Sequence, residues 1–364
     1  MMEQIAIALG PENVCCLTGV KSNPKKFHDL SAIKVYRRPG AFHGHKYSQA
    51  VHLFFSLMEI SLKERPRIMH LSTCYEGYLG LLAHRWLNIP FVIYAHGNEI
   101  LAALDSKWEK PRLAMRKAMC VLANSRYTAS LVEKAGVKPE AINIIPLGCD
   151  TKKFRPQEPD PMFREIVLGY RGKNRIILSV GNLVERKGHD MVIKAMPLIL
   201  KQMPDTTYLV VGDGPYKKQL ELLVSSLGIE EYVVFTGRVS DEELPDFYSL
   251  CDVFAMPSRE RLDSHDVEGF GIVFLEAGAS GKAVVGGRSG GVEDAIIDGS
   301  TGLLVDPFDI DNIGQTLIEL LKNDQLRIRL GKQGLARVQN EFTWEIVGKN
   351  VQKILERATL NKVS

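Results

Sequence analysis

The chain has 364 residues, of which 45% are hydrophobic and 24% are charged. At roughly 100–200 residues per domain, this length predicts two globular domains or one large one. The ordinary apolar fraction excludes intrinsic disorder, collagen-like sequence and coiled coils. The longest apolar-looking stretch, residues 50–62, is too short to cross a bilayer, and the first residues show no secretory leader, so we expect a soluble protein.

The six cysteines are scattered along the chain without a Cys-x-x-Cys pair. This spacing is typical of buried thiols in a reducing compartment rather than of a disulfide framework or a zinc site. We therefore expect a cytoplasmic protein.

The net charge of +3 conceals a difference between the two halves of the chain. Residues 1–155 carry 22 basic and 12 acidic side chains, whereas residues 156–364 carry 24 and 31. Basic runs at residues 21–46 and 107–117 each face a single acid. Either run alone is typical of a solvated basic surface. The difference between the halves nevertheless favours an anionic partner for the first one, namely lipid head groups, phosphorylated acceptors or nucleic acid.

Short β-rich apolar runs alternate with helical patterns along the whole chain. Helices are predicted at residues 2–9, 47–61, 78–86, 126–134, 191–203 and 216–226. Strands are predicted at 14–17, 68–71, 91–94, 120–123 and 142–145, and again at 176–180, 208–211, 233–235, 253–255 and 283–285. Continuous apolar strands separated by helices indicate parallel sheets that are covered on both faces.

Residues 148–173 interrupt this alternation with three prolines and several charges, which indicates a linker. The sequence therefore predicts two doubly wound α/β domains. In such folds a ligand binds at the carboxyl ends of the strands, so we expect it in a cleft between the domains.

The first informative motif is a strand that ends at Gly181 and is followed by Arg186, Lys187 and a helix start near Asp190. Free amide groups, the positive end of the helix dipole and the Lys187 charge would together form an anion pocket. An ordinary strand-to-helix loop, in which Gly181 makes the turn and Asp190 begins the helix, explains this motif equally well.

The second motif, Glu268-Gly-Phe-Gly-Ile-Val-Phe-Leu-Glu276, is sharper. Its glycines allow the backbone to approach a ligand closely before an apolar helix begins. The two carboxylates are at most about 12 Å apart along a helical axis. Because Glu276 interrupts an otherwise apolar face, packing alone explains it poorly. One acid would hydrogen-bond a transferred hydroxylated group, and the other would accept a hydrogen bond from a ribose diol.

Together with Val-Gly-Asp-Gly-Pro at 211–215, Phe-Thr-Gly-Arg-Val at 235–239 and Met-Pro-Ser at 256–258, these motifs resemble the retaining glycosyltransferases of family 4. The loop at residues 259–267 is similar to that of phosphatidylinositol mannosyltransferases. The resemblance implies the GT-B fold, with two Rossmann-like domains facing across a cleft. Residues 1–155 would form the acceptor domain and residues 156–344 the nucleotide-sugar domain, with a helix at 345–364 packing back on the first.

The resemblance also implies roles for individual residues in the second half. The donor diphosphate is expected at Gly181, Asn182, Arg186 and Lys187. The sugar is expected at Glu268, Gly269, Phe270, Gly271 and Ile272, the ribose at Glu276, and the nucleobase at Gly237, Arg238 and Val239. The family usually has arginine where this chain has Asn182, and we expect Arg186 to compensate.

His96, in the first half, follows a predicted strand and precedes Gly97. A lone histidine at a strand end is more often structural, but the resemblance implies that His96 lies beside the transferred sugar. His96, Lys187 and Glu268 are therefore the expected catalytic residues.

The resemblance implies a same-face transfer in which the leaving diphosphate accepts the proton of the acceptor. No covalent nucleophile, cofactor or metal is then expected, and helix capping explains Asp309-Ile-Asp311 better than a metal site does. The expected partners are a nucleotide sugar, with GDP-mannose as the first choice, and an anionic or lipid acceptor at the cytoplasmic face of the membrane. No nucleic acid is expected.

The opening strand and glycine-rich loop of the family have no counterpart before the helix predicted at residues 2–9. Either the start of the coding sequence is incomplete, or the protein binds a nucleotide sugar without transferring it. A nucleotide-sugar epimerase of the same fold is a third reading, which the paired glutamates disfavour.

Overall fold

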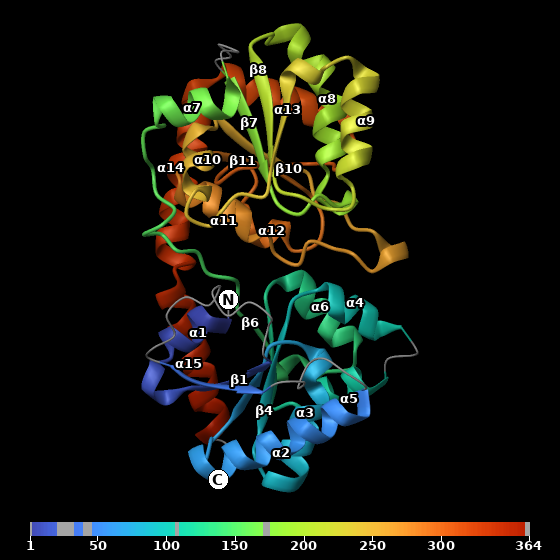
Figure 1. Cartoon of the computed structure of the whole chain (residues 1–364), viewed down its shortest axis with the longest axis vertical. Coiled ribbons are helices and arrows are strands. Elements are labelled where there is room, and N and C mark those ends of the chain that lie inside the picture. The colour runs from blue at the N-terminus through green and yellow to red at the C-terminus, as the bar shows by residue number, and fades with distance from the viewer. Residues whose placement is uncertain (1, 20–32, 39–45, 106–108, 170–174, 361–364) are drawn as a thin grey trace. The chain divides into compact units, whose positions relative to one another are not determined.

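The computed structural model describes residues 2–19, 33–38, 46–105, 109–169 and 175–360, which form two compact units (Figure 1). One unit contains residues 1–146 and 344–364, and the other contains residues 147–343. The boundary therefore precedes the one expected after residue 155. The reason is that Cys149 N donates to Phe342 O at 2.7 Å and the Phe154 ring packs edge-on against Tyr248, so both residues belong to the second unit.

The first unit contains two parallel sheets within the described residues. The four strands of the larger sheet are, in spatial order, β3 (Met69–Leu71), β4 (Phe91–Ala95), β5 (Cys120–Ala123) and β6 (Ile142–Ile144). The smaller sheet pairs β1 (Cys15–Gly19) with β2 (Lys34–Arg38). Every residue of β4 and β5 is buried, which explains their continuous apolar sequences.

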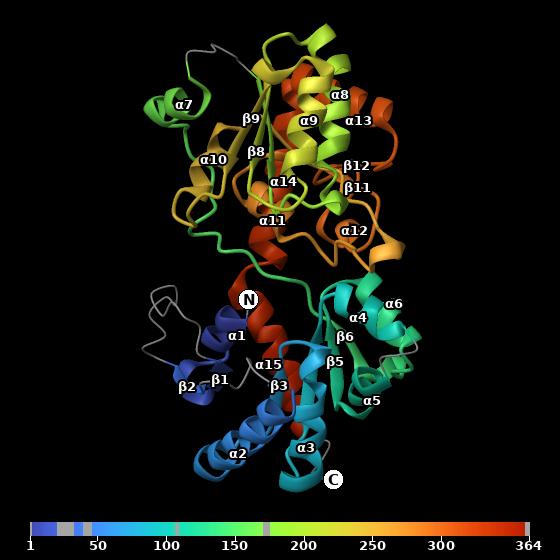
Figure 2. The ribbon, with the colours of Figure 1, turned by 45° about the vertical axis from the view of Figure 1, so that its right-hand side comes forward.

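Seven α-helices belong to the described part of the first unit. They are α1 (Met2–Ala8), α2 (Lys46–Glu64), α3 (Gly77–Leu87), α4 (Asn98–Leu104), α5 (Glu109–Lys117), α6 (Arg126–Lys134) and α15 (Trp344–Leu360). The last of these, α15, packs closely against α1, since a Cβ atom on Gly348 would lie 2.1 Å from Ala8 Cβ (Figure 2). The C-terminal helix therefore returns to the first unit.

The second unit is built on a six-stranded parallel sheet. Its strands are, in spatial order, β12 (Leu303–Val305), β11 (Ala283–Gly287), β10 (Val253–Met256), β7 (Arg175–Val180), β8 (Thr206–Val211) and β9 (Val233–Gly237). The order runs outward from β7 in both directions and reverses between β7 and β10. This reversal is the topological switch point of a doubly wound sheet.

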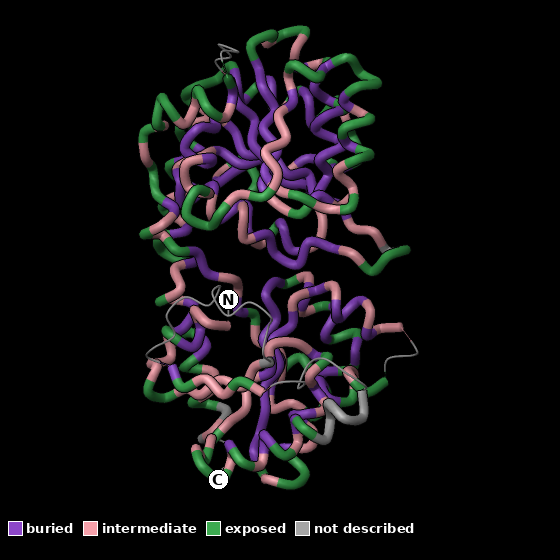
Figure 3. The backbone as a smooth tube through the Cα atoms, in the orientation of Figure 1, coloured by how far each residue is buried: buried purple, intermediate pink, exposed green. Residues whose placement is uncertain are grey.

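Both faces of this sheet are buried. On β7, Ile176 and Leu178 point into one core while Ile177 points into the other. Helices α10 (Leu244–Leu250), α11 (Ile272–Ala279) and α14 (Asp324–Glu341) line the first core, and α8 (His189–Gln202), α9 (Lys217–Leu227) and α13 (Ile310–Lys322) line the second. Figure 3 shows the burial concentrated along the strands. Alternating side chains that are all buried produce the unbroken apolar runs of the sequence.

The remaining helices of the second unit are α7 (Pro161–Leu168) and α12 (Val292–Ala295). Helix α7 lies in the segment predicted to be a linker. The Asp160 side chain caps it by accepting from Met162 N, Pro161 occupies its first turn, and Phe163 packs edge-on against Phe247. The linker prediction was therefore wrong for these residues.

No helix within the described ranges is long and apolar enough to cross a membrane.

Candidate functional site

The loops that follow β7 and β10 leave the sheet at the switch point of the second unit. Gly181 begins the first loop, and Pro257 begins the second. At this point the chain leaves β7 and β10 toward opposite sides of the sheet, which opens a crevice outside the carboxyl ends of the strands. Doubly wound sheets bind their ligands in this crevice. The strand order therefore brings together the two motifs singled out in the sequence.

Backbone contacts join the loops after β7, β8 and β9. Gly181 N donates to Val211 O at 3.0 Å, and Gly212 N donates to Gly237 O at 2.8 Å. Gly212 has a φ of +138°, and a Cβ atom there would lie 1.9 Å from Gly181 O. Only glycine fits such an approach, which explains the Gly-Asp-Gly sequence after β8.

Lys187 ends a short 3₁₀ turn, Glu185–Lys187, that precedes α8. The turn closes on Gly188, which has a φ of +74° and whose Cβ atom would lie 2.2 Å from Pro257 O. The turn after β7 is thus pressed against the loop after β10. The Lys187 side chain also lies against Gly181, where a Cβ atom would be 3.7 Å from Lys187 Cε.

Two cations and two carboxylates meet at this position. Lys187 Nζ lies 2.5 Å from Glu268 Oε2, and a guanidinium nitrogen of Arg186 lies 2.8 Å from the same oxygen. Arg186 Nε also donates to Asp266 Oδ1 at 2.6 Å. Burial opposes ionisation of Glu268, but the charges of Lys187 and Arg186 outweigh it and lower the pKa of this carboxyl. Glu268 is therefore an ionised acceptor in a buried position.

The backbone around Glu268 is held in place by the loop after β11, because Gly291 N donates to Glu268 O at 2.8 Å. Gly269 and Gly271 follow, and α11 begins at Ile272, so the amide groups of this turn lack partners within the helix. The Phe270 ring is buried and packs against Phe342. Phe270 can therefore contribute its amide group to a ligand, whereas its side chain belongs to the core.

Glu276 lies one helical turn into α11 and is half-buried. The Tyr248 hydroxyl donates to Glu276 Oε2 at 2.7 Å, and burial raises the pKa of this carboxyl. Tyr248 was missed in the sequence because nothing in the pattern of α10 separates it from an ordinary core aromatic. The contact orients Glu276 and uses one of its oxygens.

The other expected donor residues lie on the loops around this cluster. Gly237 ends β9 with a φ of +74°, Arg238 is exposed, and Val239 packs partly against the core. Asn182 is exposed on the loop after β7. Arg186, expected to compensate for Asn182, lies beside Lys187 and shares Glu268 with it. The ligand roles of these residues stay predictions.

His96 follows β4 in the first unit and is oriented by its neighbours. Its ring Nε2 lies 3.0 Å from Ser72 O, and its backbone N donates to Glu99 Oε1 at 2.5 Å. Since a carbonyl oxygen only accepts, Nε2 carries a proton. The ring also stacks on Tyr94 with centroids 5.0 Å apart. Glu99, three residues after His96, is a buried acid that no sequence motif singled out.

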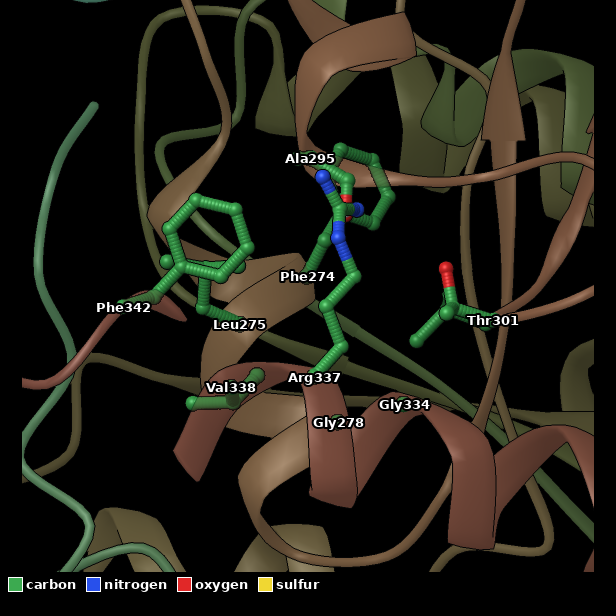
Figure 4. A pocket seen from close by; sticks show the side chains of 10 residues that line it. Phe274, Leu275, Gly278, Ala295, Thr301, Gly334, Arg337, Val338 and Phe342 are labelled. Atoms are coloured by element: carbon green, nitrogen blue, oxygen red, sulfur yellow. The ribbon is translucent and has the colours of Figure 1, made fainter. Parts of the chain in front are cut away.

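The second unit also contains a small internal cavity between α11 and α14 (Figure 4). Its volume is about 10 Å³, and its lining includes Phe274, Arg337 and Phe342. The Arg337 guanidinium lies 4.8 Å from the Phe342 ring centroid and donates to Ala295 O. Such a cavity holds one water molecule at most, so it is a packing feature rather than a ligand site.

The sequence led us to expect no metal site and a helix cap at Asp309. Within the described ranges, no group of three or more His, Cys, Asp or Glu side chains is arranged to hold a metal ion. Asp309 caps α13 by accepting from Asn312 N, as expected.

In the basic run at 107–117, Glu109 forms ion pairs with Arg112 and Arg116. Most of the run at 21–46 lies outside the described residues.

Comparison with known families covers most of the chain. Residues 13–153 match the model for Glycosyltransferase Family 4, and residues 165–337 match the model for Glycosyl transferases group 1. A GDP-mannose-dependent alpha-(1-6)-phosphatidylinositol monomannoside mannosyltransferase from Mycolicibacterium smegmatis is 37% identical over 76% of this chain and 72% of its own length. A GDP-mannose-dependent monoacylated alpha-(1-6)-phosphatidylinositol monomannoside mannosyltransferase from Corynebacterium glutamicum is 37% identical over 64% of this chain and 60% of its own length.

Solved structures show the same fold. HepE from Anabaena in complex with UDP and glucose superposes with a TM-score of 0.81 at 20% identity, covering 98% of this chain and 94% of that one. Sucrose-phosphate synthase from Thermosynechococcus elongatus superposes with a TM-score of 0.80 at 22% identity, covering 98% and 92%. The chain thus has the GT-B fold and belongs to the family 4 glycosyltransferases, enzymes that move a sugar from an activated donor to an acceptor.

Proposed function

We propose that this protein transfers mannose from GDP-mannose to a phosphatidylinositol-type lipid acceptor with retention of configuration. The observation that carries the proposal is the buried contact between Lys187 and Glu268 at the switch point of the second unit. The names of the M. smegmatis and C. glutamicum relatives supply the sugar, the nucleotide and the class of acceptor.

The charge cluster is suited to a donor that has an anionic diphosphate next to a polyhydroxyl sugar. Lys187 and Arg186 would bind the diphosphate oxygens through charge-assisted hydrogen bonds. Glu268, ionised beside them, would accept hydrogen bonds from the sugar hydroxyls. A loop with cations alone would bind the diphosphate but would offer no carboxylate to the sugar hydroxyls. A neutral loop would lack the charge that binds the diphosphate.

In the reaction we propose, the acceptor hydroxyl attacks the anomeric carbon on the face that the diphosphate leaves, and the diphosphate takes up the hydroxyl proton. Lys187 and Arg186 would stabilise the charge that develops on the departing diphosphate. Because these fixed cations can carry that charge, we propose that no metal ion takes part. His96 would lie beside the transferred sugar, with its ring oriented by the contact from Nε2 to Ser72 O.

We also propose that the acceptor is reached at a membrane surface. Helix α2 carries Phe55 and Leu62, which are 64% and 73% exposed and lie seven residues apart on one helical face. The same helix carries Lys63, which lies within 6 Å of the Tyr36 ring, as does Arg38, which also pairs with Glu59 of α2. Exposed apolar side chains beside cations are typical of surfaces that bind anionic lipid head groups.

We further propose that the protein acts at the cytoplasmic face of the membrane, since its cysteines are scattered along the chain without a disulfide framework.

A transfer assay tests this function. Radiolabelled GDP-mannose is incubated with the protein and vesicles containing phosphatidylinositol or its mannosylated forms, with phosphatidylcholine vesicles as the control. We expect label in the lipid fraction only with the inositol lipids, and an α-linkage in the product. Absence of transfer from GDP-mannose to every inositol lipid would overturn the proposal, and transfer from UDP-glucose instead would show a different donor.

A further inference from the structure

The loop after β10 contains a short excursion, residues 259–266, that the proposed reaction does not explain. Its stem is closed by two backbone hydrogen bonds, from Arg261 N to Asp266 O at 2.8 Å and from Asp266 N to Arg261 O at 3.0 Å. Asp266, at its end, binds Arg186. The excursion therefore contacts the turn that carries the two cations.

Arg259, at the start of the excursion, is the most buried of its charged residues, with 4% of its surface exposed. Its guanidinium lies 3.0 Å from Asp190 Oδ1 and 3.4 Å from Glu185 Oε1. Its backbone N donates to Arg186 O at 2.8 Å. The Arg259 side chain thus joins Glu185, which precedes Arg186 and Lys187, to Asp190, which follows them.

Glu185 and Asp190 are the acids that flank Lys187 in the sequence, and Asp190 is only 3% exposed. Asp190 Oδ2 pairs with Lys194 at 3.1 Å, and Arg259 is the ion-pair partner of the other oxygen, Oδ1, which has no hydrogen bond of its own. Without Arg259, Glu185 would keep its ion pair with Arg261, but the buried Oδ1 of Asp190 would lose its cation and would attract the nearby Lys187 and Arg186 instead. The cations would then be drawn away from the position that they hold beside Glu268.

We propose that Arg259 is a positioning residue for the diphosphate-binding turn, which it braces from Glu185 to Asp190 so that Lys187 and Arg186 face the leaving group. This inference rests on the proposed function, because it assumes that the turn binds a diphosphate. Arg259 itself does not touch the donor.

The test compares the binding of GDP and GMP by titration calorimetry, because only GDP has the β-phosphate. Arg259→Gln is the main variant, and Arg259→Lys keeps the charge on a shorter side chain without the guanidinium group that contacts both acids. Arg175→Gln is the matched control, since Arg175 also bridges two acids, Asp252 and Asp324, but does so at the amino end of β7.

We expect the wild type and Arg175→Gln to prefer GDP over GMP to the same extent. Arg259→Gln should bind GDP about tenfold more weakly, as expected for the loss of one charge-assisted contact, while GMP binding changes less than twofold. Arg259→Lys should bind GDP with an affinity between those of the wild type and Arg259→Gln. This variant provides the measurement if Arg259→Gln does not fold.

Equal weakening of GDP and GMP, or an unchanged preference for GDP, would overturn the positioning role while leaving the donor site intact. A wild-type protein that shows no preference for GDP would instead contradict the proposed function.

Discussion

Lys187 Nζ and Glu268 Oε2 lie 2.5 Å apart, although the two residues are 81 positions apart in the chain. Each residue is 8% exposed, so the pair is shielded from water and its charges interact strongly. Its position at the carboxyl ends of β7 and β10 follows from the reversal of strand order between them.

The first prediction concerns the Lys187 ammonium. Lys187→Ala should slow turnover by about 2.7–4 kcal/mol in activation free energy, the effect typical of losing one charge-stabilising donor. Steady-state transfer rates measure this effect. Lys217→Ala is the control, because Lys217 forms an exposed pair with Glu221 on α9 and should behave as the wild type does. Near-normal turnover in Lys187→Ala would show that the diphosphate binds elsewhere.

The second prediction concerns Glu276 and the ribose. Glu276→Gln should raise the KM for GDP-mannose with little change in kcat, because a ribose contact is present in both the ground state and the transition state. The wild type should bind GDP about tenfold more tightly than 2′-deoxy-GDP, and the variant should lose this preference.

Glu341→Gln, on the exposed end of α14, is the matched control for Glu276 and should keep the preference. If Glu276→Gln retained full discrimination against the deoxynucleotide, the ribose would be recognised by other groups.

The third prediction tests the close approach of the loops after β7 and β8. Gly212→Ala should destabilise the second unit by more than about 2 kcal/mol, because its Cβ atom would lie 1.9 Å from Gly181 O. Gly228→Ala is the control, since Gly228 also has a positive φ but no atom within 4 Å of the added Cβ. That variant should lose only about 1–2 kcal/mol. Equal losses in urea denaturation would mean that the approach contributes nothing beyond backbone strain.

Much of the fold could be predicted from the sequence because apolar periodicity reports burial directly. Every predicted strand and helix is present, with ends shifted by at most a few residues. Strand β2 was missed because its sequence, Lys-Val-Tyr-Arg-Arg, lies in a basic run and buries none of its residues fully. Strand β12 was missed because its three apolar residues lie between turn-forming residues, Asp-Gly-Ser-Thr-Gly before them and Asp-Pro after them.

The sequence predicted the parts of the site that local motifs encode, but not the contacts between those parts. The glycines and charges around Lys187 and Glu268 indicated two ligand loops, but the direct ion pair depends on strand order, which no local pattern records. The same holds for Arg259, whose partners Glu185 and Asp190 are about 70 positions away. Tyr248 is a similar case, since its partner Glu276 is known only once α10 and α11 are packed.

The fourth prediction concerns pH and His189. This residue is 1% exposed, and burial together with the Lys187 charge lowers its pKa to about 4. Between about pH 6.5 and pH 4 the unfolded chain binds a proton at His189 that the folded chain excludes, so stability falls as the pH falls. From pH 7.5 to 5.5 this residue should account for about 1.4 kcal/mol of lost stability.

His189→Gln should remove this part of the pH dependence, measured as the change in unfolding free energy of the second unit between the two pH values. His265→Asn, at an exposed position with a φ of +51°, should leave it unchanged. An identical pH dependence in His189→Gln and the wild type would mean that folding does not lower the pKa of His189.

The most direct test of the central claim is a crystal structure of the protein with GDP-mannose. The account predicts a diphosphate oxygen within hydrogen-bonding distance of Lys187 Nζ, a sugar hydroxyl on Glu268 and the ribose at Glu276. A nucleotide bound away from the loops after β7 and β10 would contradict the account, whatever the transfer assay shows.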